Sequence, residues 1–184
     1  RYGTLEDLQA LTRAAHARGI RVLADVVLNH VHDSHPTYNA QPDWFHPICL
    51  CGDDCDWNTK AVECWFQPYM PDLDYRYDDA VEQFTDMAVD WVRRADLDGF
   101  RVDAVKHVHL NVLWTLRQKL DQLTATTGER LYLVGETFVG DWGGGGGEAE
   151  GLIAAYIDPS TLDGQFDFPL YWNLVRALAR SEIS

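Results

Sequence analysis

The sequence has no long apolar stretch and few basic residues for its length. No apolar run approaches the ~20 residues that a membrane-spanning helix needs, so we do not expect a transmembrane protein. Lysine and arginine number 15 against 29 aspartates and glutamates, which gives a net charge of −14. Because nucleic-acid phosphates would be repelled by such a surface, we expect no nucleic-acid partner.

The sequence also lacks a phosphate-binding turn. Neither a G-x-G-x-x-G nor a Walker-type motif follows any expected strand. The glycine run from Gly143 to Gly147 has no Lys-Ser/Thr pair after it. We therefore interpret this run as a flexible loop rather than a phosphate cradle.

The chain does contain enough apolar residues for a core, since 46% of its residues are apolar and seven are tryptophan. It opens on Arg1-Tyr2-Gly3, with neither an initiator Met nor a signal-peptide pattern. It stops within an expected helix, Trp172 to Ile183. We therefore expect these residues to be a part of a longer protein.

Helical and β-type patterns alternate along the chain. The first helix has a capping-box pattern from Thr4 to Asp7, and the strands are apolar runs with little alternation, typical of a parallel sheet buried on both faces. The expected helices are 5–18, 80–95, 110–126 and 172–183, and the expected strands are 20–28, 99–104, 131–137 and 166–168. This alternation predicts an α/β fold with parallel strands and right-handed crossovers.

Residues 31–78 interrupt the alternation. They form a long irregular segment that is rich in proline, aspartate, asparagine, cysteine and aromatic residues. Segments of this length are usually functional excursions or small subdomains. We therefore divide the chain into an α/β part at 1–30, an inserted Cys-rich subdomain at 31–78 and a second α/β part at 79–184.

Two of the expected strands end in carboxylates. Asp103 follows the run from Gly99, and Glu136 follows the run from Leu131. On neighbouring parallel strands both acids would emerge at one end, where α/β barrels place their chemistry. Arg101, on the same strand face as Asp103, would favour the ionised form of that acid. Two carboxylates that face each other across a cleft suit glycosidic bond cleavage. The alternative is that Arg101 and Asp103 form only a structural ion pair and that Glu136 caps a helix.

Four segments, in order along the chain, carry a resemblance to a known family. They are Asp25 to His30, Met70 to Asp74, Arg101 to His107 and Gly135 to Thr137. Together they resemble the ordered signature of the alpha-amylase family of retaining glycoside hydrolases. The resemblance covers nearly the whole chain and implies a partial (β/α)8 TIM barrel, with about half of the strands and an irregular insertion after one of them.

The resemblance implies roles for the two acids. Asp103 matches the nucleophile that forms a glycosyl-enzyme ester. Glu136 matches the acid that protonates the leaving oxygen and then acts as the base for the incoming water. Such an acid holds its proton near neutrality, which requires a less polar setting or a neighbouring negative charge.

The resemblance also implies substrate contacts. The matching residues are His30, Arg101, Lys106 and His107. His30 matches a histidine that hydrogen-bonds the sugar beside the scissile bond. Lys106 and His107 match a pair found in members that act on α-1,4-linked glucans, so the expected substrate is starch or a maltodextrin.

A calcium site is implied as well. Asn29, Asp72 and the backbone carbonyl of His107 match calcium ligands, and oxygen ligands of this kind suit Ca²⁺. Three ligands are fewer than the usual number of about six to eight, so the others would come from the insertion or from water. The alternative is that Asn29 and Asp72 hydrogen-bond the loop backbone.

Other functions on the same scaffold stay open. A glucanotransferase, a branching enzyme or a sucrose- or trehalose-acting relative would keep Asp103 and Glu136 but transfer or rearrange the glycosyl unit. A relative without catalysis could bind glycans only, although such proteins have typically lost one of the two acids.

The four cysteines all lie in the insertion, as Cys49, Cys51, Cys55 and Cys64. A zinc site would prefer paired C-x2-C spacing, which is absent, so two disulfides in a secreted or periplasmic protein fit better than zinc or free thiols. Three pairings are open. The aromatic residues nearby are expected mainly to form the core of the insertion, with at most two facing the cleft.

The polypeptide by itself is expected to be inactive and to aggregate. The family carries a further catalytic aspartate after the seventh barrel strand, and this chain ends before that point. Half a barrel also leaves two parallel sheet edges unpaired.

Overall fold

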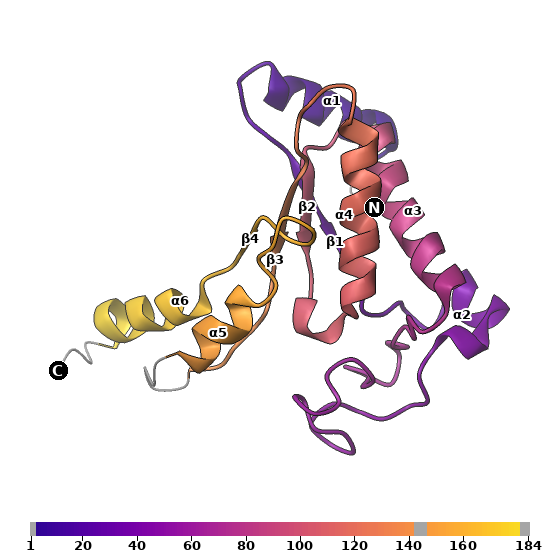
Figure 1. Ribbon diagram of the computed structural model, residues 1–184, viewed down its shortest axis with the longest axis vertical. Coiled ribbons are helices and arrows are strands. Elements are labelled where there is room, and N and C mark those ends of the chain that lie inside the picture. The colour runs from indigo at the N-terminus through magenta and orange to yellow at the C-terminus, as the bar shows by residue number, and fades with distance from the viewer. Residues whose placement is uncertain (1–2, 142–146, 181–184) are drawn as a thin grey trace.

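The computed structural model describes residues 3–141 and 147–180, and it contains one parallel sheet (Figure 1). The strands lie in sequence order β1-β2-β3-β4. They are β1 (Leu23–Val26), β2 (Gly99–Val102), β3 (Tyr132–Gly135) and β4 (Gly164–Gln165). The predicted α/β fold with parallel strands is confirmed, and the strands are shorter than the apolar runs from which they were predicted.

Helices α1 (Leu5–His16), α3 (Asp78–Ala95) and α4 (Leu110–Thr124) cover the sheet on one side. Helix α3 packs against both of the others, and α3 and α4 run side by side in Figure 1. Apolar residues recur every three or four positions on α3, as in Val81, Phe84, Ala88 and Val92, so one face of that helix is buried. This packing buries one face of the sheet. The residues that follow the carboxyl ends of the strands are left to form the site.

Residues 31–78 leave the sheet after β1 and return to it before α3. They contain the short helices α2 (Pro36–Ala40) and Pro42–Trp44, and most of the rest is irregular. The two ends of the segment meet, because the amide of Val31 donates to the carbonyl of Pro71 at 3.1 Å. Phe45 and Leu73 join the same buried core as the strands and helices.

The last part of the chain differs from the sequence prediction. The strand expected at 166–168 is wrong, because β4 ends at Gln165 and α6 (Phe168–Leu174) begins immediately afterwards. The carboxylate of Asp167 accepts a hydrogen bond from the amide of Leu170 at 2.8 Å and caps the helix, and Pro169 lies in its first turn.

The final helix therefore begins four residues earlier than its predicted start at Trp172, and it continues as a π-helical turn over Val175–Ala179. Helix α5 (Glu148–Ala154) precedes it. Both lie away from α3 and α4 in Figure 1. The predicted glycine loop lies largely outside the described residues, as does Ile183. Among the described helices, none is both long and apolar enough to cross a bilayer.

Candidate active site

Asp103 and Glu136 occupy equivalent positions on neighbouring strands. Val102 pairs with Gly135 in the parallel register, so the residues that follow them lie next to each other. The ladder extends one step beyond both strands: the amide of Asp103 donates to Val26, and that of Glu136 to Val102, each at 2.9 Å. The sheet therefore presents both acids at its carboxyl edge, as the sequence predicted.

Arg101 connects the acids. Its guanidinium lies 2.7 Å from an oxygen of Asp25 and 2.6 Å from an oxygen of Asp103, and it also contacts Glu136. Burial opposes the charge on Arg101, but the hydrogen bond to Asp25 and the charges of Asp103 and Asp25 outweigh it, so the pKa of Arg101 is raised. The arginine stays cationic and sets the relative positions of the acids.

The charges in this cluster do not balance. Three carboxylates, those of Asp25, Asp103 and Glu136, surround the single guanidinium of Arg101. With every group ionised, the cluster carries three negative charges and one positive charge. Arg101 is thus the cationic partner that these three carboxylates share.

A cleft of about 450 Å³ opens over the acids. Asp103 and Glu136 lie in its wall with Lys106 and His107. Three aromatic residues are among the apolar residues of the lining: Trp57, Phe66 and Phe138. Trp57 and Phe66 come from the insertion, which agrees with the prediction that at most two of its aromatic residues face the cleft.

Phe138 was missed by the sequence analysis. It lies two residues after Glu136 and is 51% exposed. Only its closeness to Glu136 in the sequence could have drawn attention to it.

A tight backbone turn places Lys106 and His107. Ala104 has a left-handed conformation, with φ of 50°, and leads into a 3-10 turn over Val105–His107. Burial lowers the pKa of Lys106. The pKa of His107 falls to about 4, mainly through burial, so its imidazole is neutral near pH 7.

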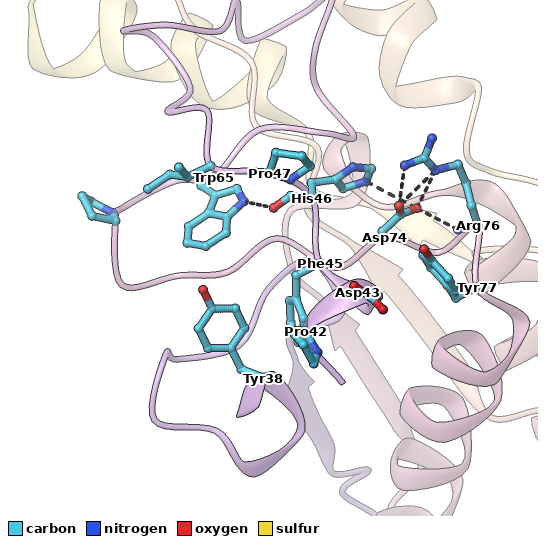
Figure 2. Close-up of a pocket in the computed structure, with 12 residues that line it drawn as sticks. Tyr38, Pro42, Asp43, Phe45, His46, Pro47, Trp65, Asp74, Arg76 and Tyr77 are labelled. Atoms are coloured by element: carbon cyan, nitrogen blue, oxygen red, sulfur yellow. Dashed lines mark hydrogen bonds and ion pairs between the residues drawn. The ribbon is translucent and has the colours of Figure 1, made fainter. Parts of the chain in front are cut away.

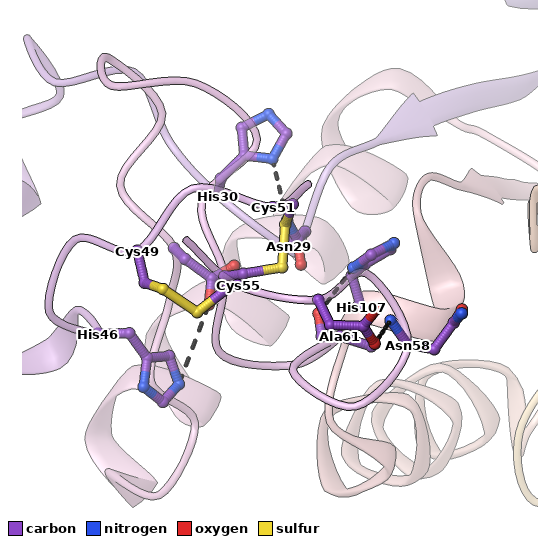
Figure 3. Close-up of a disulfide and its surroundings, with 12 residues drawn as sticks. Asn29, His30, His46, Cys49, Cys51, Cys55, Asn58, Ala61 and His107 are labelled. Carbon is purple, nitrogen blue, oxygen red and sulfur yellow. Dashed lines mark hydrogen bonds and ion pairs between the residues drawn. A yellow bond between two sulfur atoms is a disulfide. The ribbon is translucent and has the colours of Figure 1, made fainter. Parts of the chain in front are cut away.

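The imidazole of His107 is held from several sides. Its Nδ1 lies 2.7 Å from the carbonyl oxygen of Ala61 (Figure 3). The ring packs edge-on against Phe66, with centroids 4.7 Å apart. Its nitrogen also lies within 4.8 Å of the sulfur atoms of Cys51 and Cys64. The side chain is thus a buried part of the cleft wall with limited freedom.

His30 is not among the described residues that line the cleft. Its ring packs against Phe66, with centroids 5.4 Å apart, and Nδ1 lies 3.2 Å from the Asn29 amide nitrogen. Burial lowers the pKa of His30 and the charge of Asp103 partly opposes this, so His30 is close enough to that acid to sense it.

Asn29 and Asp72 form a buried group of oxygens. The side chains of Asn29 and Asp72 are each 1% exposed. Asn29 Oδ1 and both carboxylate oxygens of Asp72 are buried without a hydrogen-bond partner in the described part of the chain. Buried polar oxygens are normally paired, and a hard cation would pair these.

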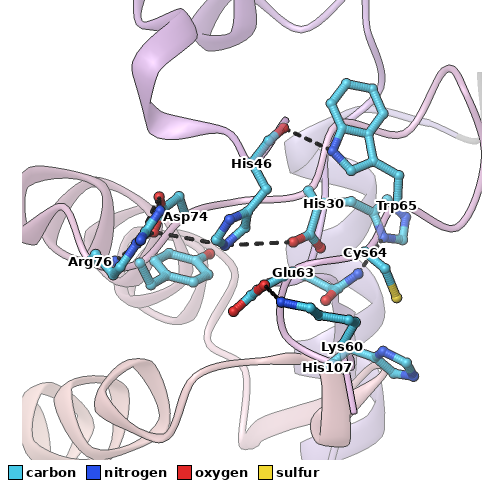
Figure 4. Close-up of polar contacts among 12 residues, drawn as sticks. His30, His46, Lys60, Glu63, Cys64, Trp65, Asp74, Arg76 and His107 are labelled. Atoms are coloured by element: carbon cyan, nitrogen blue, oxygen red, sulfur yellow. Dashed lines mark hydrogen bonds and ion pairs between the residues drawn. The ribbon is translucent and has the colours of Figure 1, made fainter. Parts of the chain in front are cut away.

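The pKa of Asp72 also agrees with the fit of these oxygens to a cation. Burial, together with the charges of Asp74 and Glu63, raises the pKa of Asp72 to about 9. A bound cation would reverse this effect. His46 lies 3.9 Å from Asp72 and 3.7 Å from Asp74 (Figure 4), but burial lowers the pKa of His46, so it supplies little compensating charge near neutral pH. The donor set therefore suits calcium.

The four cysteines form two disulfides, Cys49–Cys55 and Cys51–Cys64 (Figure 3). The prediction of two disulfides is confirmed, and the alternative of zinc bound to these thiolates is wrong because no cysteine of the chain is free. This is one of the three open pairings, and its Cys64 is fully buried next to His107.

A second hollow, of about 550 Å³, lies on the insertion (Figure 2). Its lining includes Tyr38, Trp65, Tyr77 and the Asp74–Arg76 ion pair. None of the predicted site residues is among the described residues that line it.

A parallel α/β sheet with two acids at the carboxyl ends of adjacent strands has the organisation of α/β-barrel enzymes. Comparison with known proteins is more specific. The family model "Alpha amylase, catalytic domain" matches residues 1–137. The chain belongs to the alpha-amylase family, and its sheet is a part of that family's barrel.

Individual relatives agree with this assignment. Alpha-amylase 1 of Lipomyces kononenkoae is 27% identical over 97% of this chain, and alpha-amylase 3 of Dictyoglomus thermophilum is 26% identical over 98%. The chain spans only 27% and 37% of those two proteins. The alpha-amylase of Geobacillus thermoleovorans, solved with acarbose, superposes with a TM-score of 0.78 and 28% identity over 95% of this chain and 36% of that one.

Proposed function

We propose that the protein carrying this chain is a glycoside hydrolase that cleaves α-1,4-glucosidic bonds of starch or maltodextrin with retention of configuration. The observation that carries the proposal is the convergence of Asp103 and Glu136 on one guanidinium in one cleft. A single guanidinium reaches two acids only over a short span, which is compatible with the separation of about 5–5.5 Å in retaining enzymes.

Asp103 would act as the nucleophile. Its carboxylate attacks the anomeric carbon and forms an ester as the bond to the leaving oxygen breaks. The guanidinium of Arg101 lies 2.6 Å from this carboxylate and holds it in position.

Glu136 would act as the acid and then as the base. Its proton passes to the leaving oxygen in the first step. The resulting carboxylate takes a proton from water as the water attacks the glycosyl ester, which releases the sugar and restores both acids.

The remaining predicted residues would bind substrate. Lys106 and His107 line the cleft, Arg101 contacts both acids, and His30 would approach the sugar from beside Phe66. A neutral His107 would contact sugar hydroxyl groups without adding charge. Asn29, Asp72 and the carbonyl of His107 would hold a calcium ion, which would neutralise the buried carboxylate and tie the insertion to the sheet. The disulfides support a secreted or periplasmic protein.

The test of catalysis is reducing-sugar release from soluble starch by the full-length protein. Glu136→Gln and Asp103→Asn should each reduce kcat by at least ~10³-fold, because each removes a group that participates in bond breaking. Asp43→Asn, a carboxylate in the second hollow, is the matched control and should retain activity. Near-normal activity in Glu136→Gln or Asp103→Asn, or an equal loss in the control, would contradict the assignment.

The products distinguish hydrolysis from transfer. With maltoheptaose as the substrate, a hydrolase forms only shorter sugars, whereas a glucanotransferase also forms longer ones. If longer products form and their formation requires Asp103, the enzyme is a glucanotransferase that uses the same two acids.

The test of calcium is the thermal midpoint of the full-length protein with and without EDTA. EDTA should lower the midpoint of the unmodified protein, since an ion bound only to the folded state stabilises it. Asp72→Asn keeps the side-chain shape but removes the charge, so its midpoint should respond little to EDTA. An equal response in both proteins would place the ion elsewhere.

A further inference from the structure

An aromatic ring lies over Arg101. The guanidinium carbon of Arg101 lies 5.9 Å from the ring centroid of Phe166. Phe166 follows β4 directly, and its amide donates to the carbonyl of Gly135 at 3.0 Å. The backbone next to Glu136 therefore helps to fix the position of this ring.

The ring and the acids use different parts of the guanidinium. The N–H groups at its edge point to Asp25, Asp103 and Glu136. The flat face has no N–H group, and an aromatic ring within about 6 Å of that face attracts the cation through its quadrupole. Phe166 is 42% exposed, so the ring that covers this face is itself only partly buried.

We propose that Phe166 is a positioning residue, which holds the plane of Arg101 so that one guanidinium serves both Asp103 and Glu136. Arginine has several rotatable bonds, and in this cluster three carboxylates compete for it. Without the ring, the guanidinium can turn toward the more exposed Asp25, whose side chain is 63% exposed. The proposal rests on the proposed hydrolase function for its kinetic part only.

The groups that face Arg101 come from every neighbouring strand. Asp25 lies on β1, Asp103 follows β2 and Glu136 follows β3, while His30 lies near Asp103. A looser Arg101 would hold the two acids less firmly in place, so kcat on starch should fall in a variant without the ring.

The kinetic test compares Phe166→Leu with Phe166→Tyr in the full-length protein. Phe166→Leu keeps an apolar side chain but removes the ring, and kcat on starch should fall about three-fold with little change in KM, as expected for one partly exposed cation–π contact. Phe166→Tyr retains a ring and should restore kcat. Tyr171→Leu, the same kind of change on α6, is the control and should leave kcat and KM unchanged.

The structural test needs no activity. In protein labelled with ¹⁵N-arginine, the ring current of Phe166 should displace the Arg101 Nε–H resonance, and Phe166→Leu should move it while Phe166→Tyr should not. An unchanged resonance in Phe166→Leu would overturn the proposal, as would an unchanged kcat of this variant in an active enzyme. If the protein does not act on starch but the resonance moves as expected, the hydrolase proposal fails and the positioning role stands.

Discussion

Gly99 shows how closely the sheet depends on a single residue. It begins β2 with φ of 146°, a backbone conformation that residues other than glycine rarely adopt. A Cβ atom at this position would overlap the carbonyl oxygen of Tyr132 on β3. The absence of a side chain therefore allows the two strands that end in the acids to pair.

Gly99→Ala should lower the free energy of unfolding by about 3 kcal/mol or more, because it combines backbone strain with a collision against a backbone that cannot yield. Urea unfolding of the full-length protein measures this loss. Gly128→Ala is the matched control: Gly128 also has a positive φ, of 69°, but nothing lies within 4 Å of its Cβ position. It should cost only about 1 kcal/mol. Equal costs would show that strain, rather than the close approach, controls this site.

At the scale of elements, the two disulfides restrain different parts of the insertion. Cys49–Cys55 closes a separation of 6 residues in a partly exposed loop, whereas Cys51–Cys64 closes 13 residues and packs beneath His107. The second disulfide thus supports the wall of the cleft, and the first restrains the loop itself.

Replacing Cys51 and Cys64 together by alanine should destabilise the protein by about 3 kcal/mol and also lower kcat/KM, because the support of His107 is lost. Replacing Cys49 and Cys55 together should cost about 2 kcal/mol and leave kcat/KM nearly unchanged. Thermal unfolding and starch kinetics of the two double variants provide the comparison. Equal losses of kcat/KM in both would contradict separate roles.

Polar contacts of His16 also join α1 to the sheet. His16 Nε2 lies 2.8 Å from Asp98, the residue before β2, and Nδ1 lies 3.3 Å from Asp96. The hydrogen bond to Asp98 raises the pKa of His16. The unfolded chain releases this proton at lower pH than the folded chain, so the stabilisation is complete below about 6.5 and is lost as the pH rises through the folded pKa.

The stability of the protein should therefore fall with pH above about 6.5 to an extent that His16→Gln removes. Urea midpoints measured from pH 5.5 to 8.5 for both proteins test this expectation. Parallel curves for the two proteins would show that His16 does not contribute to the slope.

At the scale of the whole molecule, the sheet has two edges. Strands β1 and β4 each pair with one neighbour within the described residues. Apolar side chains at or beside those edges are exposed, including Leu23, Val27 and Phe166. Unpaired edges with apolar side chains promote association between chains.

The 184-residue polypeptide expressed by itself should therefore self-associate and show no starch hydrolysis. Size-exclusion chromatography with light scattering measures the association, and reducing-sugar release measures the activity. A monomer whose starch hydrolysis is abolished by Asp103→Asn would contradict the expectation.

Much of the candidate site follows from local sequence. Each acid ends an apolar run, and parallel strands in register bring such ends together, so the proximity of Asp103 and Glu136 could be predicted from these runs alone. Residues 166–168 were wrongly predicted as a strand. Asp167 and Pro169 favour the start of a helix here, but the sequence does not show that β4 ends before them.

The sequence by itself determined the α/β class, the two acids and the number of disulfides, because each depends on residues close together in the chain or on chemistry set by residue type. Only the tertiary structure decided the pairing of the cysteines, the burial of Asp72 and the placement of Phe138 and Phe166. These features depend on contacts between segments far apart in the sequence, and no local pattern encodes which distant side chains will meet.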